Sequence, residues 1–186
     1  LSALADARSA GAKIITLGHG GKLEKIAKQA GLVHIPIPEC VQPRCATGYF
    51  FSSILAVLER LGLVAPQQEH LNQLSLFLKA RVRQQEQIGK ELAKKLVGLV
   101  PIIYGPSSLY GATRTFKIKI NENSKVQSFF SVFPELNHNE MVGFTKMLMK
   151  PAIIYLKSKF MHPRILQRMN VMEELLKDKM PFHSIQ

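Results

Sequence analysis

Apolar residues follow two different spacings along this chain. Short apolar and β-branched runs, which are typical of strands, occupy residues 13–17, 33–37, 100–105, 127–133 and 151–157. Longer segments with an apolar residue every three to four positions, which are typical of helices, occupy residues 1–11, 23–31, 46–61, 67–96 and 163–178. Because the two kinds of segment alternate, the pattern predicts an α/β sandwich with a mostly parallel sheet flanked by helices.

Within this pattern, two segments have a distinctive composition. The run VPIIYG at residues 100–105 is entirely apolar, as in a strand buried on both faces of a parallel sheet. The predicted helix at residues 67–96 is amphipathic, and we expect its buried side to carry Leu71, Leu74, Leu78, Val82 and Ile88.

One segment, TFKIKI at residues 115–120, fits two structures. Its alternation of polar and apolar residues favours a strand. The alternative is a helix that leads into the polar sequence NENSK.

The composition narrows the kinds of partner. At 186 residues, the chain is the size of one ordinary domain and can bury a core. It carries 25 Lys and Arg against 13 Asp and Glu, a formal charge of +12, which favours anionic partners. The basic residues are dispersed among acidic ones and there is no tryptophan, so a nucleic-acid partner is disfavoured and phosphorylated small molecules suit the charge equally well.

The cysteines and the longest apolar runs give further expectations. Cys40 and Cys45 lack the further ligands that a zinc site needs, so we expect free thiols in a reducing cytoplasm and no bound metal. No apolar run approaches the roughly 18 residues of a membrane span, so no membrane partner is expected. The first residues read as a helix without a capped start, and we expect the chain to be a fragment that begins inside a domain.

Two motifs near the amino terminus can bind anions. GHGGK at residues 18–22 lies between a predicted strand and a predicted helix; it fits a phosphate site or a plain turn, and it matches neither glycine-rich nucleotide template. In PECVQPR, prolines hold Arg44 near the carboxyl end of a strand. Its guanidinium can bind an anion or stabilise an enediolate, and the alternative is a surface ion pair.

The sequence NENSKVQSFFSVFPELNHNE, residues 121–140, contains two polar motifs around an apolar run. Glu122 can act as a base if burial raises its pKa, and His138 has asparagine neighbours able to orient its ring. A carboxylate and an imidazole are what sugar isomerisation requires, for proton transfer and for ring opening. The alternative is an exposed loop. We expect residues 127–133 to form a buried strand that fixes both motifs to one sheet.

These motifs carry a resemblance to a known family. Pro43 and Arg44 followed by ATGY, then VPIIYG, NENSK and FPELNHNE resemble the bifunctional phosphoglucose/phosphomannose isomerase family, whose fold is built from sugar isomerase (SIS) domains. The resemblance implies an isomerase that interconverts glucose 6-phosphate or mannose 6-phosphate with fructose 6-phosphate. It implies Glu122 as the base, His138 as the ring opener and Arg44 as the cation facing the enediolate.

The same resemblance implies a homodimer in which His138 serves the partner's site, a phosphorylated hexose substrate and no cofactor. It favours a helix before NENSK. It divides the chain into the end of a first SIS subdomain at residues 1–40, connecting helices at 41–98 and most of a second SIS subdomain at 99–186.

The chain also departs from the family pattern. The family's Ser/Thr-rich phosphate loop and a carboxyl-terminal lysine would lie outside residues 1–186. We therefore expect a fold truncated at both ends, without turnover in isolation. Two other classes stay open: a non-catalytic sugar-phosphate-binding SIS regulatory module, which has no need of a base, and a nucleic-acid binder, which only the charge supports.

Overall fold

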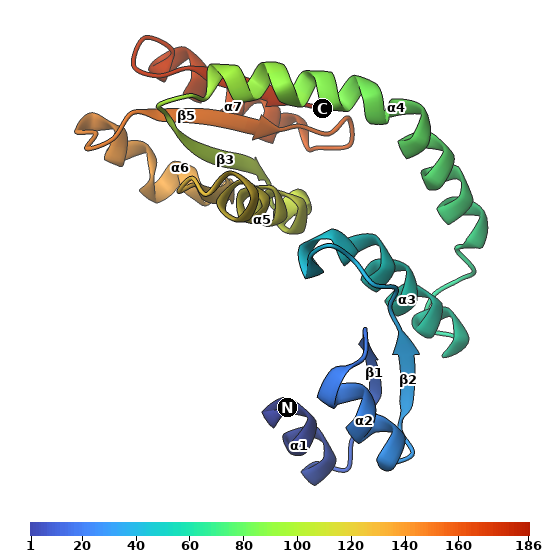
Figure 1. Cartoon of the computed structure of the whole chain (residues 1–186). Coiled ribbons are helices and arrows are strands. Elements are labelled where there is room, and N and C mark those ends of the chain that lie inside the picture. The colour runs from blue at the N-terminus through green and yellow to red at the C-terminus, as the bar shows by residue number, and fades with distance from the viewer. The chain divides into compact units, whose positions relative to one another are not determined.

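A computed structural model describes all residues, 1–186, and the chain divides into two compact units, Leu1–Arg81 and Val82–Gln186 (Figure 1). Both units are built from parallel strands and helices, so the predicted α/β class is confirmed. No helix combines the length and the apolar character that crossing a membrane requires.

The first unit contains a small two-stranded parallel sheet. Its elements are α1 (Ser2–Ser9), β1 (Ile15–Gly18), α2 (Gly21–Gln29), β2 (Val33–Pro36), η1 (Pro43–Ala46), α3 (Thr47–Arg60) and the beginning of α4 (Gln68–Lys95). Strands β1 and β2 pair in parallel with Ile15 opposite Val33. The fully buried apolar positions are few, namely Ala27, Ile37 and Ala46.

The second unit contains a four-stranded sheet in the order β4-β3-β5-β6, and every neighbouring pair is parallel. Its strands are β3 (Val100–Pro106), β4 (Phe129–Phe133), β5 (Pro151–Leu156) and β6 (Phe182–Ile185). The central strands β3 and β5 are almost entirely buried, as the apolar runs VPIIYG and PAIIYL predict. Strand β6 was not predicted.

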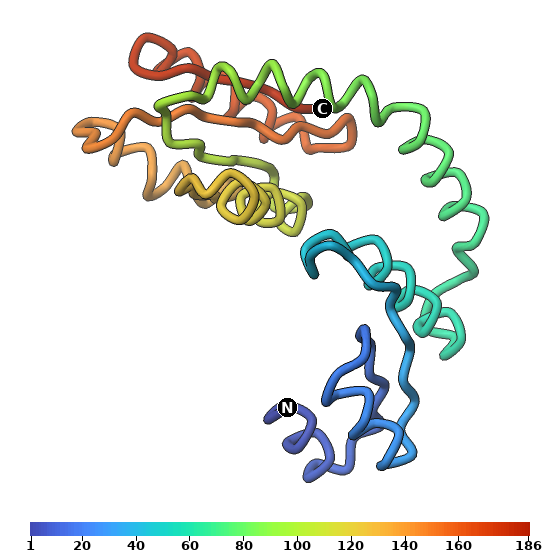
Figure 2. The backbone as a smooth tube through the Cα atoms, in the orientation of Figure 1, coloured from blue at the N-terminus to red at the C-terminus, as the bar shows by residue number.

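Helices cover both faces of this sheet. Helix α5 (Tyr110–Lys119) packs against β3 and β4 on one face, where Thr113 approaches Gly105 so closely that a Cβ there would clash. The other face carries the main core beneath α6 (Leu136–Asn139), η4 (Met141–Thr145) and α7 (Pro163–Leu176). Figure 2 traces the yellow-to-orange path from α5 through α6 to β5.

The strand predicted from the polar–apolar alternation of residues 115–120 is wrong. These residues complete α5 and enter a π-helical turn, Ile120–Ser124, so the helix implied by the resemblance is confirmed. The physical reason is topological, because parallel strands β3 and β4 need a crossover connection between them, and a helix is the usual one.

Two burial expectations are also wrong. Four residues expected on the buried side of α4 are exposed, with exposed fractions of 43–63%: Leu74, Leu78, Val82 and Ile88. Only Leu71 is half-buried. Helix α4 runs from one unit into the other, so no single core accompanies it along its length.

The strand expected to be buried at residues 127–133 is the edge strand β4. Phe129 is 42% exposed, whereas Phe133 at the other end is fully buried. An edge strand has only one neighbour, and part of its faces stays open to solvent.

Candidate functional site

The glycine-rich motif forms the turn between β1 and α2. Gly20 and Gly21 have φ angles of 66° and 76°, which a residue with a Cβ adopts only at a cost. His19 Nδ1 lies 3.1 Å from the Ile37 carbonyl oxygen and ties the turn to the segment after β2. The turn geometry alone therefore explains why glycines occupy these positions, and no bound ligand is needed to explain them.

Arg44 lies in the first unit, on the short helix η1, eight residues beyond the carboxyl end of β2. Pro43 begins this turn, and the Thr47 hydroxyl donates a hydrogen bond of 3.2 Å to the Arg44 carbonyl oxygen. Arg44 is half-buried. Cys40 and Cys45 on either side of it are free thiols, as predicted. No cluster of three or more His, Cys, Asp or Glu suits a metal ion.

Glu122 lies on the π-helical turn that ends α5, and its side chain is exposed. The turn is fixed by neighbouring side chains. Asn121 Nδ2 donates to the Val126 carbonyl oxygen at 3.0 Å. The buried Ser128 hydroxyl has two acceptors, the Lys117 carbonyl oxygen at 3.1 Å and Asn121 Oδ1 at 3.3 Å. Single π turns occur frequently at functional sites.

His138 lies on α6, the short helix that follows β4, and is also exposed. Leu136 on the same helix is fully buried in the core. Asn137 accepts a hydrogen bond from Arg168 Nη1 at 3.4 Å, and Asn139 donates to Glu135 at 3.2 Å. The neighbouring asparagines therefore contact Arg168 and Glu135.

A buried tyrosine connects α6 to the sheet. The hydroxyl of Tyr104 on β3 donates a hydrogen bond of 2.5 Å to Glu140 Oε2, directly after α6. Burial, followed by the hydrogen bond to Glu140, raises the pKa of Tyr104 well above its usual range, so the hydroxyl stays protonated as a donor. A second buried tyrosine, Tyr155, donates to the Met169 carbonyl oxygen at 3.1 Å and does not contact α6.

Glu122 and His138 lie at opposite ends of the strands of one sheet. We call these ends the amino edge and the carboxyl edge of the sheet. Helix α5 runs back from the carboxyl end of β3, so the Glu122 turn lies beside the amino end of the sheet, and its neighbours Ile120 and Ser124 line a cavity of about 600 Å³ with Leu99. His138 follows the carboxyl end of β4. The strand between them has five residues, a span of about 13 Å at ~3.3 Å per residue. The chain thus does not bring its own base and imidazole candidates together.

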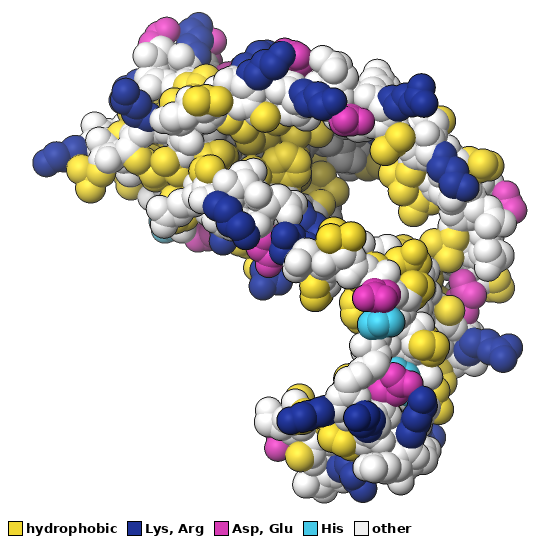
Figure 3. All heavy atoms as spheres, in the orientation of Figure 1, with side chains coloured by type: hydrophobic (Ala, Val, Ile, Leu, Met, Phe, Trp, Pro, Cys, Tyr) yellow, Lys and Arg dark blue, Asp and Glu magenta, His cyan; other side chains and the backbone are white.

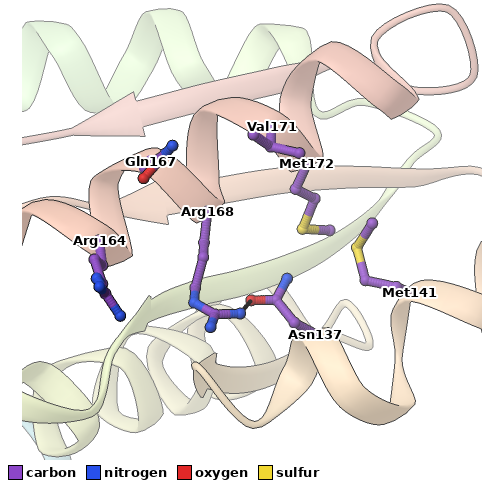
Figure 4. Close-up of a pocket in the computed structure, with 7 residues that line it drawn as sticks. All are labelled: Asn137, Met141, Arg164, Gln167, Arg168, Val171 and Met172. Atoms are coloured by element: carbon purple, nitrogen blue, oxygen red, sulfur yellow. Dashed lines mark hydrogen bonds between the residues drawn. The ribbon is translucent and has the colours of Figure 1, made fainter.

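Sequence reasoning missed a pocket of about 610 Å³ between α6 and α7 (Figure 4). Its lining residues are Asn137, Met141, Arg164, Gln167, Arg168, Val171 and Met172. The available signal was the sequence PRILQR, which sets two arginines four positions apart, on one face of the predicted helix. Elsewhere, Lys and Arg side chains are scattered over the visible surface of both units, in keeping with the dispersed charge of the sequence (Figure 3).

Two relatives match nearly the whole chain. A bifunctional phosphoglucose/phosphomannose isomerase of Caldicellulosiruptor bescii is 38% identical over 191 residues, covering 95% of this chain and 56% of the relative. One of Aquifex aeolicus is 28% identical, covering 96% of this chain and 54% of the relative. The chain spans about half the length of the curated relatives that it matches.

Solved structures agree on the fold. A putative phosphosugar isomerase from Clostridium difficile 630 has a TM-score of 0.68 at 19% identity, covering 92% of this chain and 51% of that one. At this identity the likeness shows the SIS-type fold alone.

The family described as bacterial phospho-glucose isomerase C-terminal SIS domain matches residues 85–186. This range is more than half of the chain and contains both Glu122 and His138. The chain therefore belongs to the bifunctional phosphoglucose/phosphomannose isomerase family, and residues 85–186 carry its C-terminal SIS domain.

Proposed function

We propose that the protein containing this chain interconverts glucose 6-phosphate, and mannose 6-phosphate, with fructose 6-phosphate through a cis-enediolate. The observation that carries the proposal is the family membership of a segment that contains both polar motifs, together with relatives named as isomerases of these two sugars. The formal charge of +12 suits a phosphorylated substrate in the cytoplasm. No cofactor is required, because the reaction only moves protons between neighbouring carbon and oxygen atoms.

The proposed chemistry divides among three residues. The His138 imidazole transfers a proton to the ring oxygen as the ring C–O bond breaks. The Glu122 carboxylate then removes the proton from C2 of the aldose, while the C2 hydroxyl loses a proton and O1 gains one. Glu122 returns the carbon-bound proton to C1, which forms the ketose. The Arg44 guanidinium balances the negative charge of the enediolate between these two steps.

We further propose that a homodimer shares its active sites between subunits. The support comes from the separation of Glu122 and His138 by the length of β4, about 13 Å at ~3.3 Å per residue. Reacting groups must lie within about 3 Å of the atoms on which they act, so a base and a ring opener at opposite sheet edges suit two different sites. Each site would then combine Glu122 of one subunit with His138 of the other.

The predicted organisation of the chain remains part of this proposal. Residues 1–40 would end a first SIS subdomain, residues 41–98 would connect, and residues 99–186 would form most of a second SIS subdomain. The compact units of this chain divide at Arg81 and Val82, inside α4.

The test mixes two inactive variants of the full-length protein, Glu122→Gln and His138→Ala, and measures conversion of fructose 6-phosphate to glucose 6-phosphate in a coupled assay. Random exchange makes half of the dimers mixed, and each mixed dimer carries one intact shared site, so activity should return to roughly a quarter of wild type. A site built within one chain would give no recovery on mixing, and absence of turnover in the wild type would overturn the isomerase itself.

A second candidate function rests on one further relative. A D-glucosamine-6-phosphate 4-epimerase of Sulfolobus acidocaldarius is 31% identical over 137 residues, covering 69% of this chain and 41% of the relative. Incubation of the full-length protein with glucosamine 6-phosphate, followed by chromatographic separation of the 4-epimers, distinguishes this activity from the aldose–ketose conversion.

A further inference from the structure

The pocket between α6 and α7 concentrates positive charge. Arg164 and Arg168 project from the same side of α7, whereas Gln167 points away from them (Figure 4). No carboxylate lines the pocket. Both side chains are exposed, and like charges four residues apart on a helix repel each other by about 0.2–0.5 kcal/mol, a cost that a bound anion would remove.

The position of Arg164 adds a second unfavourable charge. It lies in the first turn of α7, which begins at Pro163, and its backbone N–H is capped by His162 Nδ1 at 3.1 Å. The amino end of a helix carries the positive end of the helix dipole, which disfavours a cation and favours an anion. Because α7 has 14 residues, its dipole adds to the field of the Arg164 guanidinium in its first turn.

The hydrogen bond between α6 and α7 leaves donors available. Arg168 Nη1 donates to Asn137 Oδ1 at 3.4 Å, a long bond that uses one of the five N–H donors of the guanidinium. Since Asn137 Oδ1 is the acceptor, the Asn137 Nδ2 amide remains as a donor. Together with the fork of Arg164, these groups can surround the oxygens of a phosphate.

The remaining lining of the pocket is apolar. Met141 faces Met172 in Figure 4, but Met172 is fully buried in the main core, so the apolar surface open to a ligand comes from half-buried Met141 and exposed Val171. Methionine side chains adapt to ligands of different shape. The volume of about 610 Å³ lies within the range of small-molecule sites, roughly 300–1,000 Å³.

We propose that the α6–α7 pocket is a binding site for a small phosphate monoester, with its phosphate held by Arg164, Arg168 and Asn137 and its carbon skeleton against Met141 and Val171. The occupant bridges the two helices next to His138, so its binding fixes α6 against α7. The site does not depend on the proposed isomerase activity, since none of its residues has a role in that mechanism.

The test uses the full-length protein labelled with [¹³C-methyl]methionine, titrated with glycerol 3-phosphate at constant ionic strength. The Met141 and Met172 methyl signals, assigned through Met141→Leu and Met172→Leu, are expected to shift and saturate. Inorganic phosphate should need higher concentrations, because it leaves the apolar surface of Met141 and Val171 uncovered, and neutral glycerol should have no effect. Inorganic phosphate binding as tightly as the ester, or shifts that do not saturate, would overturn the assignment.

A pair of charge-matched double variants makes the test specific. Arg164→Gln with Arg168→Gln should weaken glycerol 3-phosphate binding at these methyls by roughly tenfold or more. The control, Lys146→Gln with Lys159→Gln, removes the same charge from two exposed positions outside the pocket and should leave the affinity unchanged. Equal behaviour of the two double variants would show that the shifts arise from general electrostatics or from another phosphate site.

Discussion

The two polar motifs at the ends of β4 are held in place by different kinds of interaction. The Glu122 turn depends on short polar bonds, from Asn121 to the backbone of Val126 and from Ser128 to Lys117 and Asn121. The His138 helix depends on the core: Leu136 is fully buried, and the hydrogen bond of buried Tyr104 reaches Glu140 just beyond the helix.

This difference follows from the position of each motif on the sheet. The Glu122 turn ends α5 at the amino edge of the sheet, and the backbone reverses direction there before β4 begins. The turn has few apolar residues to bury. The four-residue helix α6 lies over the main core, because the chain must cross the sheet from β4 to β5. A helix so short has little stability of its own, so its position is set by what it packs against.

The comparison is tested first by removing the proposed base. Glu122→Gln in the full-length protein should lower kcat by roughly 10²–10⁴-fold, since the amide cannot accept the carbon-bound proton. Substrate binding should persist, because glutamine keeps the shape of the side chain and the family's phosphate loop lies outside this motif. Steady-state kinetics and a direct binding titration measure the two effects separately.

The matched control for that variant is Glu135→Gln, which alters another exposed carboxylate at the opposite edge of the sheet. Its turnover should stay within about twofold of wild type. Near-normal turnover in Glu122→Gln would show that Glu122 is not the base. The difference between the two motifs would then concern stability alone and not catalysis.

A second prediction concerns the carboxyl edge. Tyr104→Phe removes the donor to Glu140 and should lower kcat by roughly tenfold, a loss of about 1.4 kcal/mol, because α6 and its His138 lose their polar connection to β3. Tyr155→Phe removes a similarly buried hydroxyl that bonds only to the Met169 carbonyl oxygen. Both variants should lose about 1 kcal/mol of stability, measured by urea unfolding.

Only the first of these two tyrosine variants should affect catalysis. Because Glu140→Gln keeps a carbonyl acceptor for Tyr104, its kcat should fall less than that of Tyr104→Phe. Equal kcat losses in Tyr104→Phe and Tyr155→Phe would mean that the hydroxyls act through general stability and that Tyr104 does not position His138.

The sequence predicted those parts of the fold that depend on local pattern. Apolar runs located β3 and β5, and helical spacing located α7, because burial in the middle of a sheet or on one face of a helix leaves a clear periodicity. The pattern was misleading at the end of α5. The alternation of TFKIKI predicted a strand, but these residues belong to the helix that connects the parallel strands β3 and β4. The exposed leucines of α4 misled it as well, because periodicity identifies an apolar face and cannot identify what covers it.

The candidate site was predictable to a different extent at each edge. Glu122 and His138 stood out as titratable groups among amides, and their placement on either side of one strand followed from the apolar run between them. Tyr104 and Glu140 lie 36 positions apart and Asn137 and Arg168 lie 31 apart, so no local pattern could pair them. These contacts exist only because the fold brings β3 beside β4 and α7 beside α6.

The smallest expected effect is at the amino edge, in Ser128→Ala. This change leaves the Lys117 carbonyl oxygen and Asn121 Oδ1 without their buried donor, so the Glu122 turn should gain freedom while the sheet stays paired. We expect kcat to fall about threefold, with KM unchanged because the turn does not hold the substrate. The control is Ser131→Ala on the same strand, half-buried and without a hydrogen bond to the turn. If Ser128→Ala lowered kcat as much as Tyr104→Phe does, polar bonds at the amino edge would fix the position of Glu122 as firmly as the core fixes His138 at the carboxyl edge. The contrast between the two edges would then be wrong.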